Sequence, residues 1–323
     1  MVYAAFIGVK DLGAMNSSSH VAIVGVGEVG GVVAYNLIIS SVVRELLLVD
    51  LDLERRNAQV EDLSDAAYST KTGTRVRPGT FKQASQCDVV VITSAVKHTI
   101  GQTTVDYTSR NCSMLRGVID AMKPFGPETI LLIVADPVDL LTSMAKELSG
   151  LPSSQVMGTG TFLDTDRLCG MLASRALVMP SEVCAYVVGI HGERQIVAWS
   201  SATIGGVCIS DSPHSQGIDR ERIETTCKHR SQELIRAKGS AGFGIGTVVA
   251  NICSSILSDK RIWGPVSFFQ PQFGCCFSMP AVIGKEGIVS QVEMVLDGEE
   301  ESMLSVSAVE LKRKVELVSS DGW

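Results

Sequence analysis

The first half of the chain alternates between two spacings of apolar residues. Short apolar runs occur at 21–24, 45–49, 88–93 and 130–134, and their apolar side chains face both sides, which is typical of strands covered by helices on both faces. Segments with the apolar spacing of helices lie between them, at 32–40, 57–67, 111–122 and 139–148. This alternation has the spacing of βαβ units, and it predicts an α/β fold with a doubly wound parallel sheet.

The pattern changes after about residue 150. Residues 164–176 are predicted to form one helix, and residues 183–188 and 204–209 are predicted to form strands. Residues 219–257 have helical spacing that is interrupted by Gly239, Gly242, Gly244 and Gly246. Residues 302–318 carry charge on one side of a helical pattern, and we expect them to pack as a closing helix. This mixture predicts an α+β domain.

The length supports a division into two domains. At roughly 150 residues per domain, 323 residues are enough for two. Residues 1–20 end in a polar stretch, and we expect them to form an N-terminal arm outside the core. The first domain then covers residues 21–150 and the second covers residues 151–323.

Composition and charge narrow the classes of partner. Hydrophobic residues make up 45% of the chain and charged residues 20%, which excludes a disordered protein. The chain has 28 Lys and Arg against 35 Asp and Glu, a net charge of -7. This sign is wrong for a protein that binds the phosphate backbone, so we expect no nucleic-acid partner.

The cysteines and the apolar runs bear on location. Nine cysteines are scattered without a Cys-x-x-Cys pair, which favours free thiols in a reducing compartment over disulfides. No apolar run is long enough to span a membrane, and residues 1–13 lack the pattern of a signal peptide. The histidines have no metal-ligand spacing. We therefore expect a cytoplasmic protein without a bound metal.

A glycine turn follows the first predicted strand. Gly25, Gly27 and Gly30 have the Gly-x-Gly-x-x-Gly spacing between a strand and a helix, where backbone N–H groups and the helix N-terminus bind a pyrophosphate. Asp50 ends the next strand, where its carboxylate can accept both ribose hydroxyls and repel a 2′-phosphate. The combination predicts NAD as the cofactor, although Arg55 and Arg56 leave the choice between NAD and NADP open.

Three polar residues of the second domain suggest chemistry for such a cofactor. Reduction of a ketone by hydride needs a proton for the carbonyl oxygen, and His191 can deliver it if a carboxylate such as Asp164 orients the ring. Arg167 lies one helical turn after Asp164, and its planar guanidinium can hold a substrate carboxylate. Taken singly, a structural histidine and a solvated arginine are the more common interpretations.

Taken together, these stretches resemble the lactate/malate dehydrogenase family, on its lactate dehydrogenase-like side. The resemblance extends over nearly the whole chain, in the stretches 21–30, 46–50, 62–64, 88–95, 134–141, 158–167, 186–193, 238–246 and 278–284. It implies an NAD-binding Rossmann domain followed by a mixed catalytic domain. It also implies His191 as the proton donor and acceptor, Asp164 as its orienting carboxylate and Arg167 as the substrate clamp. The cofactor-binding residues that it implies are Gly25, Gly27, Glu28, Val29, Gly30, Asp50, Thr93, Ser94, Ala95 and Asp136.

The chain departs from the family pattern around the substrate. Thr104 stands where the family has a loop arginine that polarises the reacting carbonyl, and His98 takes the loop position that separates lactate from malate specificity. Asp136 replaces an asparagine that contacts both substrate and cofactor, and Ala241 replaces a pocket threonine. The resemblance therefore implies substrate contacts from Arg167, His98, Asp136 and Ala241. Candidate replacements for the missing cation are Lys97, His98 and Arg194.

Two functions from different classes follow. The first is an NAD-dependent, L-lactate dehydrogenase-like enzyme that interconverts a 2-oxo acid and a 2-hydroxy acid, on a bulkier or specialised substrate. The alternative is a weak or inactive family member that binds a nucleotide or a partner, or an enzyme that reuses the site for a different reaction. Because the arm at residues 1–20 resembles arms that wrap neighbouring subunits in the family, we expect a homo-oligomer, either a dimer or a tetramer.

Overall fold

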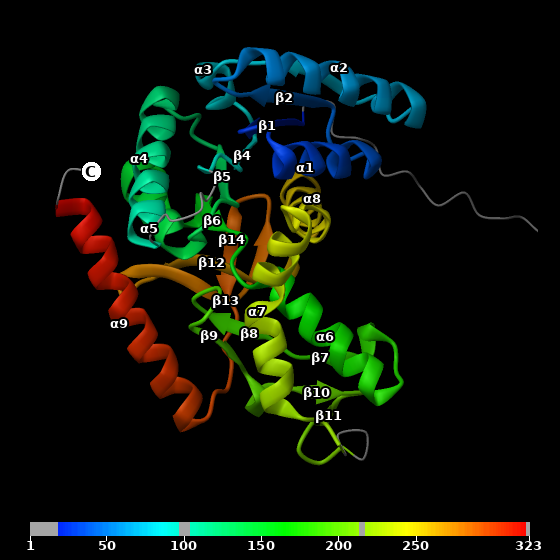
Figure 1. Ribbon diagram of the computed structural model, residues 1–323, viewed down its shortest axis with the longest axis vertical. Coiled ribbons are helices and arrows are strands. Elements are labelled where there is room, and N and C mark those ends of the chain that lie inside the picture. Colours follow the sequence, from blue (N-terminus) through cyan, green and yellow to red (C-terminus); the bar gives the residue numbers. More distant parts are fainter. Residues whose placement is uncertain (1–18, 97–103, 213–216, 321–323) are drawn as a thin grey trace, which may run out of the picture.

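The structure is a computed structural model that describes residues 19–96, 104–212 and 217–320 (Figure 1). Its helices are α1 (Glu28–Ile39), α2 (Leu53–Thr70), α3 (Phe81–Ala84), α4 (Thr104–Met122), α5 (Val138–Ser149), α6 (Phe162–Ala176), α7 (Arg220–Lys238), α8 (Gly242–Ser258) and α9 (Gly298–Ser320). The strands of the first half are β1 (His20–Val24), β2 (Glu45–Val49), β3 (Arg75–Pro78), β4 (Val89–Ile92), β5 (Ile130–Ile133) and β6 (Val156–Gly158). Those of the second half are β7 (Val183–Cys184), β8 (Val187–Gly189), β9 (Gln195–Val197), β10 (Thr203–Ile204), β11 (Val207–Cys208), β12 (Ile262–Gln270), β13 (Cys275–Gly284) and β14 (Gly287–Gln291).

The first six strands form a parallel sheet in the order β3-β2-β1-β4-β5-β6. Helices cover both faces: α4 packs with α5 on one side, and α1 packs with α2 and α8 on the other (Figure 1). This burial on both sides explains why β4 and β5 are apolar throughout and why β1 is apolar after His20. The strand order reverses between β1 and β4, and the carboxyl ends of the strands there form the crevice in which such sheets bind ligands.

The same sheet continues into the second half of the chain with antiparallel strands. β12 pairs with β6, β13 pairs with β12, β14 and β8, and β9 pairs with β8. A separate small sheet has the order β11-β10-β7. α9 runs along the outside, against β13 and α5 (Figure 1).

The predicted doubly wound sheet is confirmed, and so is the change to a mixed architecture after it. The four predicted strands of the first half correspond to β1, β2, β4 and β5, and the helical segments to α1, α2, α4 and α5. The predicted helix at 164–176 is α6, and the closing helix is α9. The expected arm falls mostly on residues 1–18, outside the described residues, whereas Ser19 is buried and His20 begins β1.

Three predictions for the second half are wrong in detail. The strand expected at 204–209 is the hairpin β10–β11, because Gly205 and Gly206 turn the chain with φ of 58° and 77°. The strand expected at 183–188 divides into β7 and β8, which belong to different sheets. The interrupted helix at 219–257 is two helices: α7 ends at Lys238 and is capped by Gly239 with φ of 89°, while Gly244 and Gly246 lie within α8.

Candidate active site

The glycine turn lies between β1 and α1, with no room for side chains at two of its glycines. Gly25 has φ of 93°, and a Cβ there would lie 2.6 Å from the backbone nitrogen of Ser94. A Cβ at Gly30 would overlap the carbonyl oxygen of Gly25. At Gly27, by contrast, a Cβ would meet nothing within 4 Å. The turn is therefore tightly packed below, and the space beside Gly27 is open to a ligand.

Neighbouring strand ends hold this turn in place. Asp50 follows β2, and its carboxylate accepts hydrogen bonds from the backbone N–H of Val26 at 2.8 Å and of Asp52 at 2.9 Å. Thr93 and Ser94 follow β4, and both hydroxyls donate to the carbonyl oxygen of Val24, at 3.3 and 2.9 Å. These side chains fix the backbone conformation that presents the N-terminus of α1 to the crevice.

One buried carboxylate connects two functional side chains in the second half. Asp164, on the first turn of α6, is 1% exposed. The His191 ring follows β8, and its Nδ1 lies 2.6 Å from Asp164 Oδ2. The Arg167 guanidinium, one helical turn further along α6, donates from Nη1 to Asp164 Oδ1 at 3.3 Å. Because a carboxylate accepts the proton of Nδ1, the other ring nitrogen, Nε2, is left for a ligand.

Two further contacts support this cluster. The backbone N–H of His191 donates to the carboxylate of Asp139 on α5 at 2.8 Å. Arg167 Nη1 also donates to the hydroxyl of Ser231 on α7 at 2.7 Å. Four different parts of the chain, namely α5, α6, α7 and the segment after β8, therefore fix the positions of the ring and the guanidinium.

The surroundings shift the titration of three of these groups. Burial by itself would lower the pKa of His191, but the adjacent Asp164 carboxylate, with Asp136 and Asp139 further away, raises it to about 9. Burial raises the pKa of Asp139 to about 6. Burial also lowers the pKa of Arg167, and Asp164 counteracts this, so the guanidinium stays protonated. These carboxylates therefore favour the imidazolium form of His191, with protons on both ring nitrogens, at neutral pH.

The other residues that the sequence analysis relates to the substrate are exposed or half-buried where the structure describes them. Thr104 is the exposed first residue of α4. Asp136 is exposed between β5 and α5, close enough to raise the pKa of both His191 and Tyr107. Ala241 precedes α8 and is half-buried. Lys97 and His98 lie outside the described residues.

Comparisons with known proteins agree with this arrangement. Residues 19–158 match the family model of the lactate/malate dehydrogenase NAD binding domain, and residues 161–321 match that of the alpha/beta C-terminal domain of the same family. The chain belongs to the lactate/malate dehydrogenase family. Membership confirms the predicted fold class, NAD as the cofactor and the class of NAD-dependent dehydrogenase.

Individual family members are similar over almost their whole length. L-lactate dehydrogenase A of Rhizopus oryzae is 39% identical, over 94% of this chain and 93% of that protein. L-lactate dehydrogenase of Thermus aquaticus is 36% identical, over 90% and 97%. Among solved structures, the minor L-lactate dehydrogenase of Enterococcus mundtii has a TM-score of 0.88 at 30% identity, with 93% of this chain and 98% of that chain covered.

The family's cofactor fits the residues around the glycine turn. The open space at Gly27 would be filled by any Cβ, and it lies beside the N-terminus of α1, where a pyrophosphate is favoured. The carboxylate of Asp50 accepts a hydrogen bond from the backbone N–H of Val26 in the turn, and its oxygens have lone pairs left for ribose hydroxyls. Arg55 is paired with Asp52 at 3.0 Å, and Arg56 donates to the carbonyl oxygen of Gly79, so both have other partners.

The residues that the sequence predicts to bind the cofactor differ in what they contact. Glu28 accepts a hydrogen bond from the hydroxyl of Ser240 and so connects α1 to the segment before Ala241. Thr93 and Ser94 hold the turn, whereas Ala95 is exposed beside it. Val29 packs partly against the core.

Arg194, a candidate replacement for the missing cation, is exposed and donates to Glu310 on α9 at 3.0 Å, so its guanidinium has another partner. Sequence analysis missed Asp139 and Ser231, whose contacts join segments 52 and 64 residues apart. Asp139 does carry a signal that analysis could have used, since it is a charged residue in an otherwise apolar helix start.

The described residues contain neither a membrane-spanning helix nor a metal-binding cluster. No described helix is both long enough and apolar enough to cross a membrane. Within the described ranges, no group of three or more His, Cys, Asp and Glu side chains is arranged to hold a metal ion.

Proposed function

We propose that this chain interconverts a 2-oxo acid and the corresponding L-2-hydroxy acid with NAD, in the manner of an L-lactate dehydrogenase. The observation that carries the proposal is the Asp164 carboxylate, which contacts both His191 and Arg167. A group that carries a proton and a group that binds anions are thereby held at one place. A 2-oxo acid needs both, one at its carbonyl oxygen and the other at its carboxylate.

His191 is proposed to move the proton. Its Nδ1–H is held by Asp164, so Nε2–H is the group that donates to the carbonyl oxygen during reduction. The raised pKa keeps the imidazolium populated at neutral pH. In the direction of oxidation, the neutral ring accepts the hydroxyl proton of the 2-hydroxy acid.

Arg167 is proposed to orient the substrate. Asp164 and Ser231 both accept from Nη1, which leaves other N–H groups of the guanidinium for a bidentate contact with the substrate carboxylate. When bound, NAD accepts or supplies the hydride. We assign its pyrophosphate to the open space at Gly27 and its ribose to Asp50, with Glu28, Val29, Ala95 and Asp136 lining the same crevice.

The substrate is proposed to be bulkier or more specialised than pyruvate. Thr104 provides no cation for the developing negative charge on the carbonyl oxygen. The loss of such a donor typically costs on the order of a hundred- to thousand-fold in rate. Asp136 also places a carboxylate near His191, where it disfavours a small anionic substrate. Ala241, followed by Gly242, leaves space for a larger side chain.

Thr104 and Asp136 also favour a second candidate. In it, the chain binds NAD or a partner and turns over slowly or not at all, or uses the site for another reaction. For either candidate function, we propose that the chain forms a homo-oligomer and is located in the cytoplasm.

The test is turnover with NADH and a panel of 2-oxo acids, from pyruvate and oxaloacetate to branched and aromatic acids. Consumption of NADH is followed by absorbance, and the variant His191→Asn is run in parallel. We expect larger apolar 2-oxo acids to be reduced faster than pyruvate, and the activity to be lost in the variant. Binding of NADH without reduction of any acid favours the second candidate.

A further inference from the structure

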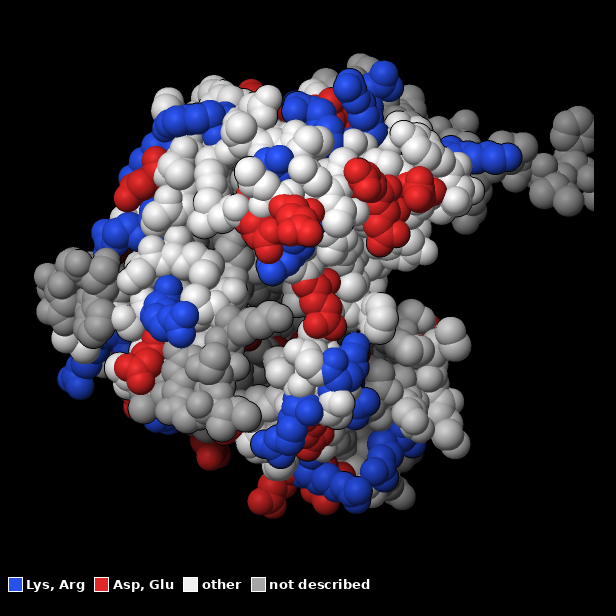
Figure 2. Space-filling model, turned by 45° about the horizontal axis from the view of Figure 1, so that its top comes forward, with Lys and Arg blue, Asp and Glu red and all other residues white. Residues whose placement is uncertain are grey.

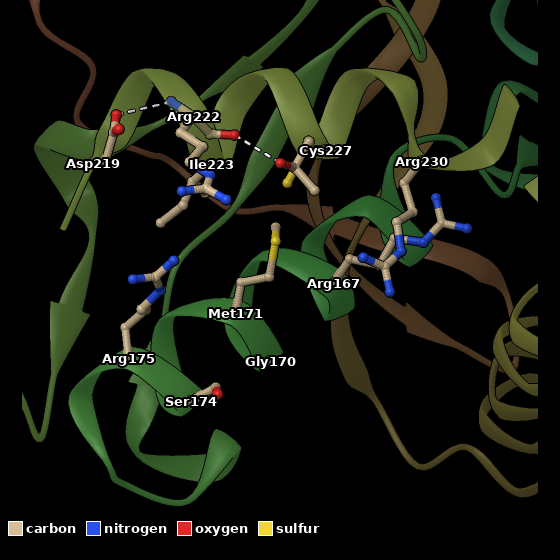
Figure 3. A pocket seen from close by; sticks show the side chains of 11 residues that line it. Arg167, Gly170, Met171, Ser174, Arg175, Asp219, Arg222, Ile223, Cys227 and Arg230 are labelled. Atoms are coloured by element: carbon tan, nitrogen blue, oxygen red, sulfur yellow. Dashed lines mark hydrogen bonds between the residues drawn. The ribbon is translucent and has the colours of Figure 1, made fainter. Parts of the chain in front are cut away.

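A cavity of about 450 Å³ lies between α6 and α7 (Figure 3). It is lined by one face of each helix: Arg167, Gly170, Met171, Ser174 and Arg175 from α6, and Arg222, Ile223, Thr226, Cys227 and Arg230 from α7 with Asp219 at its start. Its volume is in the range of sites for small molecules. Among these residues, only Arg167 has a role in the proposed reaction.

The lining has an excess of positive charge. Four arginines face one carboxylate, that of Asp219, which accepts from the backbone N–H of Arg222 at 3.0 Å as the N-cap of α7. Within the described ranges, Arg175, Arg222 and Arg230 form no ion pair, and their guanidinium groups donate no hydrogen bond. Unpaired guanidinium groups that face a shared cavity favour an anionic occupant.

The charges lie at the two ends of the cavity. Figure 3 shows Arg175 and Arg222 together at one end and Arg167 and Arg230 together at the other, with the side chain of Met171 between them. The wall between the two ends includes Ile223 from the opposite helix, which is buried. A complementary ligand therefore has two separated acidic groups and an uncharged middle.

We propose that this cavity is a second anion site, which binds an elongated ligand with two acidic groups, one between Arg175 and Arg222 and the other beside Arg230. The ligand is either a dicarboxylate or a bisphosphate, since guanidinium groups bind both through paired hydrogen bonds. Arg167 separates this site from the substrate position at His191, so the two sites have one side chain in common.

The surface charge is consistent with access by anions. Figure 2 shows several blue side chains, with a few red ones among them, at the lower right of the molecule. Arg175, Arg222 and Arg230 are all exposed, so an anion reaches them from solvent. The net charge of the chain is -7, so these exposed arginines have the opposite sign to the chain as a whole.

Calorimetry on the protein without NAD or substrate tests the proposal, independently of any catalytic activity. The probes are succinate, glutarate and adipate as dicarboxylates and butane-1,4-diol bisphosphate as a bisphosphate, with acetate and inorganic phosphate as references that have one acidic group. We expect one-to-one binding of at least one ligand with two acidic groups, at least about tenfold tighter than its reference with one acidic group. Which series binds more tightly identifies the acidic group.

Three variants locate the binding. The double variant Arg175→Gln with Arg222→Gln should weaken binding at least about tenfold, because it removes the guanidinium groups from one end. Arg236→Gln removes the same charge from α7 outside the cavity lining and should leave the affinity unchanged. Arg175→Lys with Arg222→Lys keeps the charge without the planar fork and should give an intermediate affinity.

The unfolding temperature of each variant without ligand shows whether it is folded. If no probe with two acidic groups binds at millimolar concentration, the proposal is overturned. It is equally overturned if the double Gln variant folds and binds as tightly as the parent, because the ligand then sits elsewhere.

Discussion

The Asp164–His191–Arg167 cluster and the positions where the sequence departs from the family differ in how firmly they are held. In the cluster, Asp164 is buried, and side chains or backbone from four parts of the chain contact it or its partners. Thr104 and Asp136 are exposed and carry the departures. The parts proposed for proton transfer and carboxylate binding are thus intact, whereas the part that stabilises charge on the carbonyl oxygen is altered. These two parts of the proposed active site can therefore change separately.

The largest expected effect comes from breaking the intact part. The variant His191→Asn removes the proposed proton donor and should lower kcat with the best 2-oxo acid by about a hundred- to ten-thousand-fold. His229→Asn is the matched control, because His229 is on α7 and is paired with exposed Glu193 at 3.4 Å. Its kcat should be that of the parent. Equal losses in both variants, measured by NADH consumption, contradict the role of His191.

The next effect comes from repairing the altered part. The variant Thr104→Arg places a cation at the start of α4 and should raise kcat/KM for pyruvate by about a hundred- to a thousand-fold, since it restores charge stabilisation at the carbonyl oxygen. Thr104→Gln adds length without charge and should give little increase. If the arginine variant is no faster than the glutamine variant, the slow step lies elsewhere, and Asp136 becomes the next position to change.

The sequence predicts features that neighbouring residues encode, but not features that depend on contacts between distant segments. β1, β2, β4 and β5 were predictable because burial on both faces makes each a continuous apolar run. β12 and β13 were not, because Pro265 and Pro280 face each other within their ladder, at positions where strand interiors normally exclude proline. Their pairing depends on tertiary packing, which local periodicity does not record.

The candidate site divides in the same way. Asp164 and Arg167 have helical spacing on α6, so the sequence alone predicts that they share a face. The contacts of Ser231 with Arg167 and of Asp139 with His191 join distant segments, and no local pattern encodes them. The arginine-lined cavity was equally invisible, because α6 and α7 supply its two walls from different stretches of sequence.

A smaller change tests the electrostatic coupling inside the intact part. Because Asp164 raises the pKa of His191 to about 9, the reduction rate should fall as the pH rises through about 9, where the imidazolium is lost. In Asp164→Asn the carboxylate is gone while burial still lowers the pKa, so this fall should move to near or below pH 6.5.

The pH profile of kcat/KM measures this shift. Glu193→Gln serves as the control, because that carboxylate is exposed and pairs with His229 rather than His191. A profile that is the same in Asp164→Asn and in the parent excludes Asp164 as the cause of the raised pKa.

The smallest effect is expected in the glycine turn, where Gly30 is tightly packed and Gly27, three residues earlier, borders open space for a ligand. Gly30→Ala forces a Cβ against the carbonyl oxygen of Gly25 and should lower the free energy of unfolding by about 1–3 kcal/mol.

The Cβ of Gly27→Ala meets no neighbouring atom, so the free energy of unfolding of this variant should change by less than about 1 kcal/mol. Its dissociation constant for NADH should nevertheless rise at least about tenfold, because the methyl group enters the space assigned to the pyrophosphate. Denaturant unfolding and NADH fluorescence measure the two quantities. If Gly27→Ala binds NADH as the parent does, the pyrophosphate does not lie at Gly27, since a methyl group there has nothing else to displace.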